Sequence, residues 1–300
     1  MSRPLSSIER EYLATNEPAE AVIDALVHAD GWMLDVDGCL VRTTKAGGAG
    51  GAAIEGAAQL LAWLRRHQRR FVICTNASQH PVSHYAGHLR DCGLDIADHE
   101  LMTAATATAD FVARHHAGAR VLVLGDRGLS EAMRDAGLQL ASSTDRNADV
   151  VAVGAADQYS SSTINAACLA VADRGASLYT SVGSPWFHGG VDRSVAVSSA
   201  MANAVAWVTG AIPQVCGKPS PALGEVLRER LGGSSSQLVV VGDAAGAEMK
   251  LAHQIDALGV LVLSGATMAK DLPGLPLDQR PHWVGRDVGQ LLQQMRAVLP

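Results

Sequence analysis

Acidic and polar side chains in this 300-residue sequence stand directly after short apolar runs, where they are placed to act on a ligand. The run WMLDVDG ends in Asp35 and Asp37, FVICTN ends in Thr75 and Asn76, and LVVVGD ends in Asp243. In open α/β sheets, ligands bind just beyond the carboxyl ends of parallel strands. We therefore expect these five residues to converge on one crevice.

A cluster of carboxylates in one crevice needs positive charge. Two like charges about 4 Å apart repel by roughly 4 kcal/mol at an effective dielectric near 20. A hard divalent cation such as Mg²⁺ prefers carboxylate oxygens, so it is the expected counter-ion. Lys218, in VCGKPSP, would add a second positive charge. A single strand-end acid is more often a helix cap or turn residue, so the prediction depends on the ordered set.

Alternating apolar and helix-like segments predict the elements that position these groups. Continuous apolar runs stand at 32–36, 71–75, 121–125, 150–154, 177–181, 238–243 and 257–263. Such runs are typical of strands covered on both faces, as in a parallel sheet. Helical spacing fills 56–70, 162–175 and 220–233. The predicted fold class is therefore α/β, with a parallel sheet between helices.

The composition excludes several classes of protein. Hydrophobic residues make up 48% of the chain and charged residues 18%, which argues against disorder. The net charge of −6 gives no reason to expect a nucleic-acid surface. No apolar run approaches the roughly 18 to 20 residues of a membrane helix. The five cysteines form no CxxC pair. A cytoplasmic protein without a disulfide framework is expected.

Four motifs in fixed order resemble the haloacid dehalogenase-like (HAD) hydrolases, and among them the NagD-like, p-nitrophenyl phosphatase branch. They are DVDGCL at 35–40, CTNAS at 74–78, GKPSP at 217–221 and VVGDAAGAE at 240–248. The resemblance implies a Rossmann-like core with a large inserted α/β cap domain of C2 type. The expected division is a helical N-terminal extension over 1–30, a catalytic core over 31–80 and 213–300, and a cap over 81–212.

The resemblance also implies the chemistry, which is Mg²⁺-dependent hydrolysis of a small phosphorylated metabolite through an aspartyl-phosphate intermediate. By matching positions, Asp35 is the nucleophile and Asp37 the general acid and base. The phosphoryl group would be held by Thr75 and the Asn76 backbone, with Lys218 assisting.

The metal ligands that the resemblance implies are the carboxylates of Asp35 and Asp243 and the main-chain carbonyl of Asp37. Asp35 is expected to be ionised at neutral pH without help. A phosphate dianion and these two carboxylates carry one more negative charge than Mg²⁺ and Lys218 neutralise. That excess favours a proton on Asp37, which can then protonate the leaving group.

The sequence departs from the family pattern at Glu248, in a loop lengthened by glycine and alanine at 46–53, and in the cap. Glu248 stands where the family usually has an aspartate, so support of the metal site by this residue is an open question. In the cap, Ser181 and Gly183 occupy the polar positions of a common Thr-Asn-x-Asp segment, so substrate recognition is expected to differ. The candidate substrate contacts in the cap are Tyr159, Trp186, His188 and Arg193. For each of them, a residue of the cap surface or cap core is the alternative.

Three alternatives stay open at this point. The same nucleophile would serve a phosphotransferase or mutase, and a catalytically weak phosphate-binding regulatory protein would carry the same motifs. A homodimer formed through the cap is compatible with either. The spacing of His80, His84, His88 and Cys92 allows only neighbouring pairs to share an ion, which disfavours a metal site there.

Overall fold

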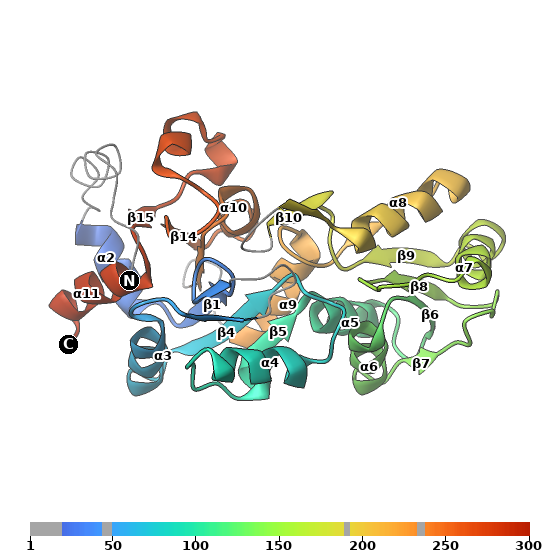
Figure 1. The fold of residues 1–300 in the computed structure, drawn as a ribbon, viewed down its shortest axis with the longest axis horizontal. Coiled ribbons are helices and arrows are strands. Elements are labelled where there is room, and N and C mark those ends of the chain that lie inside the picture. Colours follow the sequence, from blue (N-terminus) through green and yellow to red (C-terminus); the bar gives the residue numbers. More distant parts are fainter. Residues whose placement is uncertain (1–19, 44–49, 189–192, 233–237) are drawn as a thin grey trace.

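The computed structural model describes residues 20–43, 50–188, 193–232 and 238–300. Two largely parallel sheets, each between helices, lie one after the other along the long axis of the molecule (Figure 1). The predicted α/β fold is confirmed. Most of the expected N-terminal extension, residues 1–19, lies outside the described residues.

The larger sheet holds the strand ends that the sequence singled out. Its six strands pair in parallel in the order β15-β14-β13-β1-β4-β5. In that order they span Trp283–Gly285, Leu258–Val262, Leu238–Gly242, Gly31–Asp35, Arg70–Thr75 and Leu101–Thr103. The three central strands β13, β1 and β4 therefore end side by side.

Helices cover both faces of this sheet because strand side chains alternate between the faces. One face packs against α2 (Glu20–His28), α3 (Ala57–Arg66), α4 (Val82–Asp91) and α11 (Val288–Val298). The other packs against α5 (Ala104–His115), α9 (Pro221–Leu231) and α10 (Lys250–Gln254). In β1, Trp32 and Leu34 join the first cluster and Met33 joins the second.

The smaller sheet has five parallel strands in the order β12-β9-β8-β6-β7. In that order they span Gln214–Val215, Ser177–Thr180, Val150–Val153, Arg120–Leu124 and Gln139–Leu140. Helix α6 (Arg127–Asp135) packs on one face, and α7 (Ser161–Arg174) and α8 (Val197–Thr209) pack on the other.

The structure differs from the expected division at both ends of the inserted segment 81–212. Strand β5 pairs with β4 in the larger sheet, so this segment begins with core elements. The smaller sheet begins only at Arg120 and takes in β12, which lies beyond 212. Strands of two or three residues are too short to carry a pattern in the sequence.

One hydrophobic cluster runs through both sheets. It includes Val72 of the larger sheet, Phe111 and Val112 of α5, and Val121 and Val150 of the smaller sheet. Because α5 contributes to the packing of both, the cap is not joined to the core by loops alone.

Two antiparallel strand pairs complete the described part of the fold. β2 (Val41–Thr43) pairs with β3 (Gly51–Ala53), and β10 (Trp186–His188) pairs with β11 (Arg193–Val195). Among the described residues, no helix is long and apolar enough to cross a membrane.

Candidate active site

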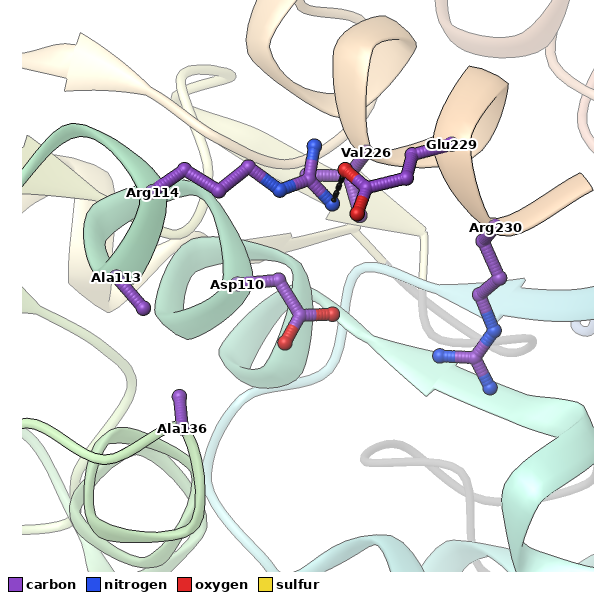
Figure 2. Close-up of a pocket in the computed structure, with 7 residues that line it drawn as sticks. All are labelled: Asp110, Ala113, Arg114, Ala136, Val226, Glu229 and Arg230. Atoms are coloured by element: carbon purple, nitrogen blue, oxygen red, sulfur yellow. Dashed lines mark ion pairs between the residues drawn. The ribbon is translucent and has the colours of Figure 1, made fainter. Parts of the chain in front are cut away.

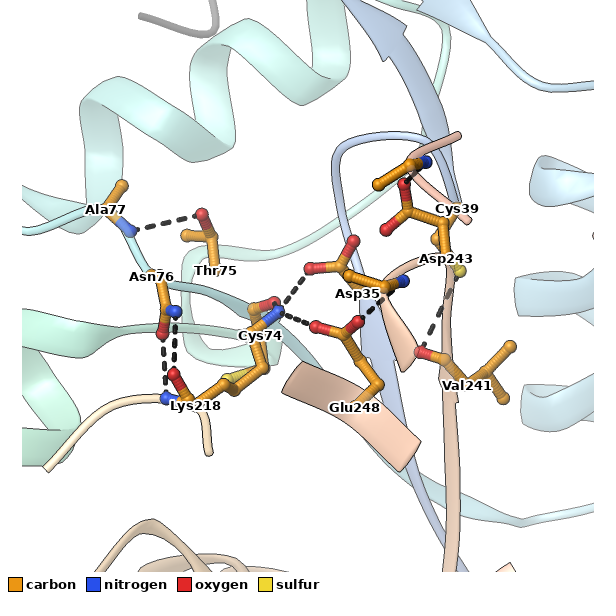
Figure 3. Close-up of polar contacts among 12 residues, drawn as sticks. Asp35, Cys39, Cys74, Thr75, Asn76, Ala77, Lys218, Val241, Asp243 and Glu248 are labelled. Atoms are coloured by element: carbon orange, nitrogen blue, oxygen red, sulfur yellow. Dashed lines mark hydrogen bonds and ion pairs between the residues drawn. The ribbon is translucent and has the colours of Figure 1, made fainter. Parts of the chain in front are cut away.

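The strand-end groups come together where β13, β1 and β4 end. Asp35 is the last residue of β1, Thr75 is the last residue of β4, and Asp243 follows β13. Figure 3 shows the carboxylate of Asp35 beside the ammonium of Lys218, with the carboxylate of Asp243 farther from the lysine. Lys218 reaches this place from the loop that precedes α9.

The ammonium group of Lys218 lies at the centre of a buried ion cluster. It makes a short contact to Oδ1 of Asp35 and lies 2.9 Å from Oε1 of Glu248 (Figure 3). It also donates a hydrogen bond of 3.1 Å to the carbonyl of Cys74. Lys218 is 3% exposed and Asp35 is 7% exposed. An ammonium with three acceptors satisfies all of its donors, as burial requires.

Burial changes the proton affinity of this pair. Burial acts to lower the pKa of Lys218, but the carboxylates of Asp35 and Glu248 outweigh it and hold the pKa well above its ordinary value. Burial raises the pKa of Asp35 well above its ordinary value, and Lys218 opposes that rise. The expectation that Asp35 ionises without help therefore overlooked burial. Its ionised form depends on neighbouring positive charge.

Glu248 is the second carboxylate that contacts Lys218 (Figure 3). Its second oxygen, Oε2, accepts a hydrogen bond of 3.0 Å from the main-chain N–H of Ala244. Glu248 belongs to a π-helical turn over Ala245–Met249, which is wider than an α-helical turn. Its stem lies over Gly242, where a Cβ would overlap Cγ of Glu248. The wider turn and the bare glycine accommodate the extra methylene of a glutamate at this position.

The carboxylate of Asp243 faces the turn that follows Asp37. Its Oδ2 accepts a hydrogen bond of 2.5 Å from the N–H of Ala266. Gly38 has a φ of 79°, and a Cβ there or at Gly265 would overlap that same oxygen. Burial first, and then the charge of Glu248, raise the pKa of Asp243 to about 7. The site therefore holds more negative charge than Lys218 alone neutralises.

Asp37 is half-buried, and its Oδ1 has no hydrogen-bond partner among the residues that the structure describes. Burial raises the pKa of Asp37, with Thr43, Lys218 and His88 acting in the opposite direction. A carboxyl group that retains its proton more readily suits a general acid. The unpartnered oxygen marks a place where a ligand or water would be bound.

Asn76 has a structural contact that the motif did not indicate. Its side chain accepts a 2.8 Å hydrogen bond from the N–H of Lys218 and donates one of 3.0 Å to the carbonyl of Lys218 (Figure 3). The hydroxyl of Thr75 accepts a hydrogen bond of 3.2 Å from the N–H of Ala77. The loop after β4 is thereby joined to the loop that carries Lys218.

The donor groups at the site fit a hard divalent cation. No group of three or more His, Cys, Asp or Glu side chains is arranged around one ion in the described part of the chain. The implied ligand set does not need one, because it counts two carboxylates and the main-chain carbonyl of Asp37. Asp35, Asp243 and Glu248 are three buried carboxylates against one ammonium, and the charge of Glu248 is, after burial, a cause of the raised pKa of Asp243. A bound cation would offset this negative charge.

The four candidate substrate contacts lie in the smaller-sheet region. The hydroxyl of Tyr159 donates a 2.6 Å hydrogen bond to the carbonyl of Gly154, which ties it to the cap itself. Across the β10–β11 pair, Cζ of Arg193 lies 4.1 Å from the centre of the Trp186 ring. His188 pairs with Arg193 through the backbone, and its side chain lies outside the described part.

A further surface cavity of about 450 Å³ lies between α5, α6 and α9 (Figure 2). Its charged walls include an ion pair of 2.5 Å between Arg114 and Glu229. The cavity contains none of the candidate site residues. Its lining residues are Asp110, Ala113, Arg114, Ala136, Val226, Glu229 and Arg230.

Sequence families place the chain. The haloacid dehalogenase-like hydrolase family matches residues 32–139, and the HAD-hydrolase-like family matches residues 215–291. These ranges together span more than half of the chain. The chain therefore belongs to the HAD-like hydrolase family.

Individual relatives place the chain within this family. It is 27% identical to the acid sugar phosphatase of Staphylococcus haemolyticus over 88% of this chain and 96% of that protein. It is also 27% identical to the ribonucleotide monophosphatase NagD of Escherichia coli over 86% of this chain and 96% of that one.

Solved structures agree with the sequence relatives. The p-nitrophenyl phosphatase from Archaeoglobus fulgidus superposes with a TM-score of 0.76 at 25% identity, covering 88% of this chain and 98% of that one. The glycerol phosphate phosphatase of Mycobacterium tuberculosis, in complex with calcium, has a TM-score of 0.76 at 25% identity, covering 90% and 76%. The expected NagD-like branch and the expected class, a HAD-family phosphatase, are confirmed.

Proposed function

We propose that this chain hydrolyses a small phosphomonoester through a phosphorylated Asp35, with Mg²⁺ as the cofactor. The observation that carries the proposal is the buried carboxylate of Asp35 at a strand end, paired with Lys218 and adjoining the loop of Thr75 and Asn76. The names of the phosphatase relatives support the reaction class.

In the first step, an oxygen of Asp35 attacks phosphorus and the bond from phosphorus to the ester oxygen breaks. Because Lys218 donates a hydrogen bond to Oδ1 of Asp35, we assign the attack to Oδ2 of Asp35. The leaving oxygen takes the proton of Asp37. Thr75, the main chain of Asn76 and Lys218 hold the phosphoryl oxygens, and their fixed positions stabilise the charge of the transition state.

In the second step, the deprotonated Asp37 accepts a proton from a water molecule that attacks the phosphorus of phospho-Asp35. The bond between phosphorus and Asp35 breaks, which releases inorganic phosphate and restores the carboxylate. The raised pKa of Asp37 supports both roles, because the residue must carry a proton in one step and accept one in the next.

The residues that would hold Mg²⁺ are Asp35 and Asp243, through their carboxylates, and Asp37, through its main-chain carbonyl. When bound, the cation stabilises negative charge on the phosphoryl oxygens. The excess of buried carboxylates over Lys218 supports a cation at this place. The calcium complex of the M. tuberculosis relative supports a divalent one.

Release of p-nitrophenolate from p-nitrophenyl phosphate, with Mg²⁺ and with EDTA, tests the proposal. We expect Asp35→Asn to abolish turnover and Asp173→Asn, an exposed position on α7, to retain it. Full activity of Asp35→Asn would refute the nucleophile. Phosphate transfer to an added sugar in place of release would favour a phosphotransferase or mutase. Thermal stabilisation by phosphate without turnover would favour the regulatory protein.

We assign substrate selection to the cap and retain Tyr159, Trp186, His188 and Arg193 as its candidates. Trp186 is 44% exposed and carries the Arg193 guanidinium over its ring, an arrangement suited to an anionic or planar group. A panel of sugar, glycerol, glycolate, nucleotide and pyridoxal phosphates tests the choice. Arg193→Ala should alter KM by different factors for different members of the panel, and should alter kcat less.

We also propose a homodimer through α8 of the cap. This 13-residue helix carries no charged side chain. Trp207 is 87% exposed near its end, and Ile212 just beyond it is 90% exposed. A second copy packing against the same face buries both without needing a charged partner. Light scattering should give twice the chain mass, and Trp207→Glu should give the monomer. A monomeric native protein at micromolar concentration would exclude this contact.

A further inference from the structure

We propose that Ser78 is a positioning residue, which together with Ser181 of the cap holds the phosphoryl-binding loop in place. The inference rests on the proposed function, because it concerns the loop that begins at Thr75 and Asn76. It assigns to two buried hydroxyl groups a role in fixing this loop against the smaller sheet.

The hydroxyl of Ser78 occupies the carboxyl edge of the smaller sheet. It accepts a hydrogen bond of 2.9 Å from the N–H of Ala155 and one of 3.1 Å from the hydroxyl of Ser181. Ala155 follows β8 and Ser181 follows β9, which are neighbouring strands. Ser78 is 2% exposed and Ser181 is fully buried. A loop of the core thus supplies the hydrogen-bond acceptor that water would otherwise supply at the ends of these two cap strands.

The next residue extends the same contact to a third cap strand. The main-chain carbonyl of Gln79 accepts a hydrogen bond of 2.8 Å from the N–H of Gly128. Its side-chain amide donates to Asp126 at 3.0 Å and to Asp157 at 2.8 Å. Asp126 comes just after β6, so consecutive residues 78 and 79 touch the ends of β6, β8 and β9.

Close backbone packing leaves this junction little freedom. A Cβ at Gly128 would overlap the carbonyl of His80, and a Cβ at Gly217 would overlap the carbonyl of Ser181. Gly217 directly precedes Lys218. The cap strand end at Ser181 is therefore in contact with both loops that approach the phosphoryl group.

Hydrogen bonds that are linked by the main chain of residues 76–78 lead from the cap to the nucleophile. The hydroxyl of Ser181 donates to that of Ser78. Asn76, two residues before Ser78 in the chain, is hydrogen-bonded to the main chain of Lys218. The ammonium of Lys218 in turn contacts Asp35. The hydrophobic cluster shared through α5 fixes the two sheets around this chain of contacts. Loss of the hydroxyl pair therefore displaces the groups that bind the transferring phosphoryl, and small displacements of such groups slow the chemical step.

The test is a double-mutant cycle of Ser78→Ala and Ser181→Ala, assayed with p-nitrophenyl phosphate and with inorganic phosphate as inhibitor. We expect each single variant to lower kcat by about tenfold or more with a smaller change in KM. The kcat of the double variant should be close to the kcat of the less active single variant, because both single changes remove the same hydrogen bond. Ser198→Ala removes a buried serine hydroxyl on α8 and should leave kcat unchanged.

Hydrogen exchange of the Ala155 amide measures its hydrogen bond to Ser78 independently of an activity assay. Its protection should fall in Ser78→Ala and persist in Ser198→Ala. If Ser78→Ala does not fold, Ser181→Ala carries the test, since its hydroxyl makes the same contact from the cap. An active native protein whose single variants keep native kcat would overturn the inference. A native protein without phosphatase activity would instead overturn the proposed function, whatever the exchange data show.

Discussion

The side-chain amide of Asn76 and the main chain of Lys218 form a closed pair of hydrogen bonds, with distances of 2.8 and 3.0 Å. The pair joins residues 142 positions apart in the sequence. Lys218 can therefore approach Asp35 from a fixed direction, because its backbone is held by the loop that also presents Thr75. The phosphoryl-binding loop and the lysine act as one unit.

Asn76→Asp tests this unit with almost no change in size. The new carboxylate still accepts from the N–H of Lys218 but repels its carbonyl, so we expect the lysine to shift. A drop in kcat of about tenfold to hundredfold is the expected result. Steady-state kinetics on p-nitrophenyl phosphate measure it, and circular dichroism checks the fold. Native kcat in a folded variant would show that the pair is dispensable.

Glu248→Gln tests whether Glu248 serves Lys218 or the metal. The amide keeps the shape but removes the charge that lies 2.9 Å from the ammonium. Breaking a buried ion pair typically costs about 3 to 5 kcal/mol. We expect kcat to fall at least tenfold while the Mg²⁺ concentration for half-activation changes less. Glu248→Asp keeps the charge but moves the carboxylate away from Lys218, so its kcat should lie between the values of the native protein and of Glu248→Gln. A large change in Mg²⁺ dependence at native kcat would assign Glu248 to the metal.

The sequence predicted the larger elements because their patterns are local. Each continuous apolar run, such as 71–75 or 238–243, became a parallel strand within about two residues of its expected ends. The acids that follow these runs lie together because parallel strands end on one edge. A cluster of acids needs a counter-charge, which indicated Lys218, and the order of the four motifs supported the same residue.

Other features depend on contacts between distant residues and left no local signal. The hydrogen bonds of Asn76 to Lys218 and of Ser78 to Ser181 arise only when the two sheets are packed. Strand β5 has three residues, too few for the sequence to separate it from the expected cap segment. The burial that raises the pKa of Asp35 is likewise a property of the folded chain.

Gly242→Ala tests the packing of the π-helical turn. A Cβ at this position would overlap the stem of Glu248, so either the turn or β13 must shift. Overpacking of this kind costs about 1 to 3 kcal/mol in the free energy of unfolding, measured by urea denaturation. Gly87→Ala in α4 is the control. Its Cβ would meet nothing closer than 4.0 Å, and alanine should stabilise the helix by about 0.5 to 1 kcal/mol. Equal effects of the two changes would contradict the predicted overlap.

Metal removal should destabilise the protein more at high pH than at low pH. The pKa of Asp243 is about 7 in the folded chain against an ordinary value of 3.8. The folded state therefore binds this proton more tightly than the unfolded state does, and stability from this group is lost as the pH rises from 3.8 towards 7. A bound cation offsets the same buried charge. In EDTA, Tm should be lower at about pH 8 than at about pH 5.5.

Mg²⁺ at about 100 times its Kd adds about 2.7 kcal/mol, which for a chain of this length is roughly 4 °C in Tm. This gain should appear near pH 8 and shrink near pH 5.5, where a proton on Asp243 competes with the cation. Asp243→Asn, which cannot ionise, should lose most of the Mg²⁺ effect at both pH values. Scanning calorimetry measures all of these changes. Equal stabilisation by Mg²⁺ at both pH values in the native protein would place the cation away from Asp243.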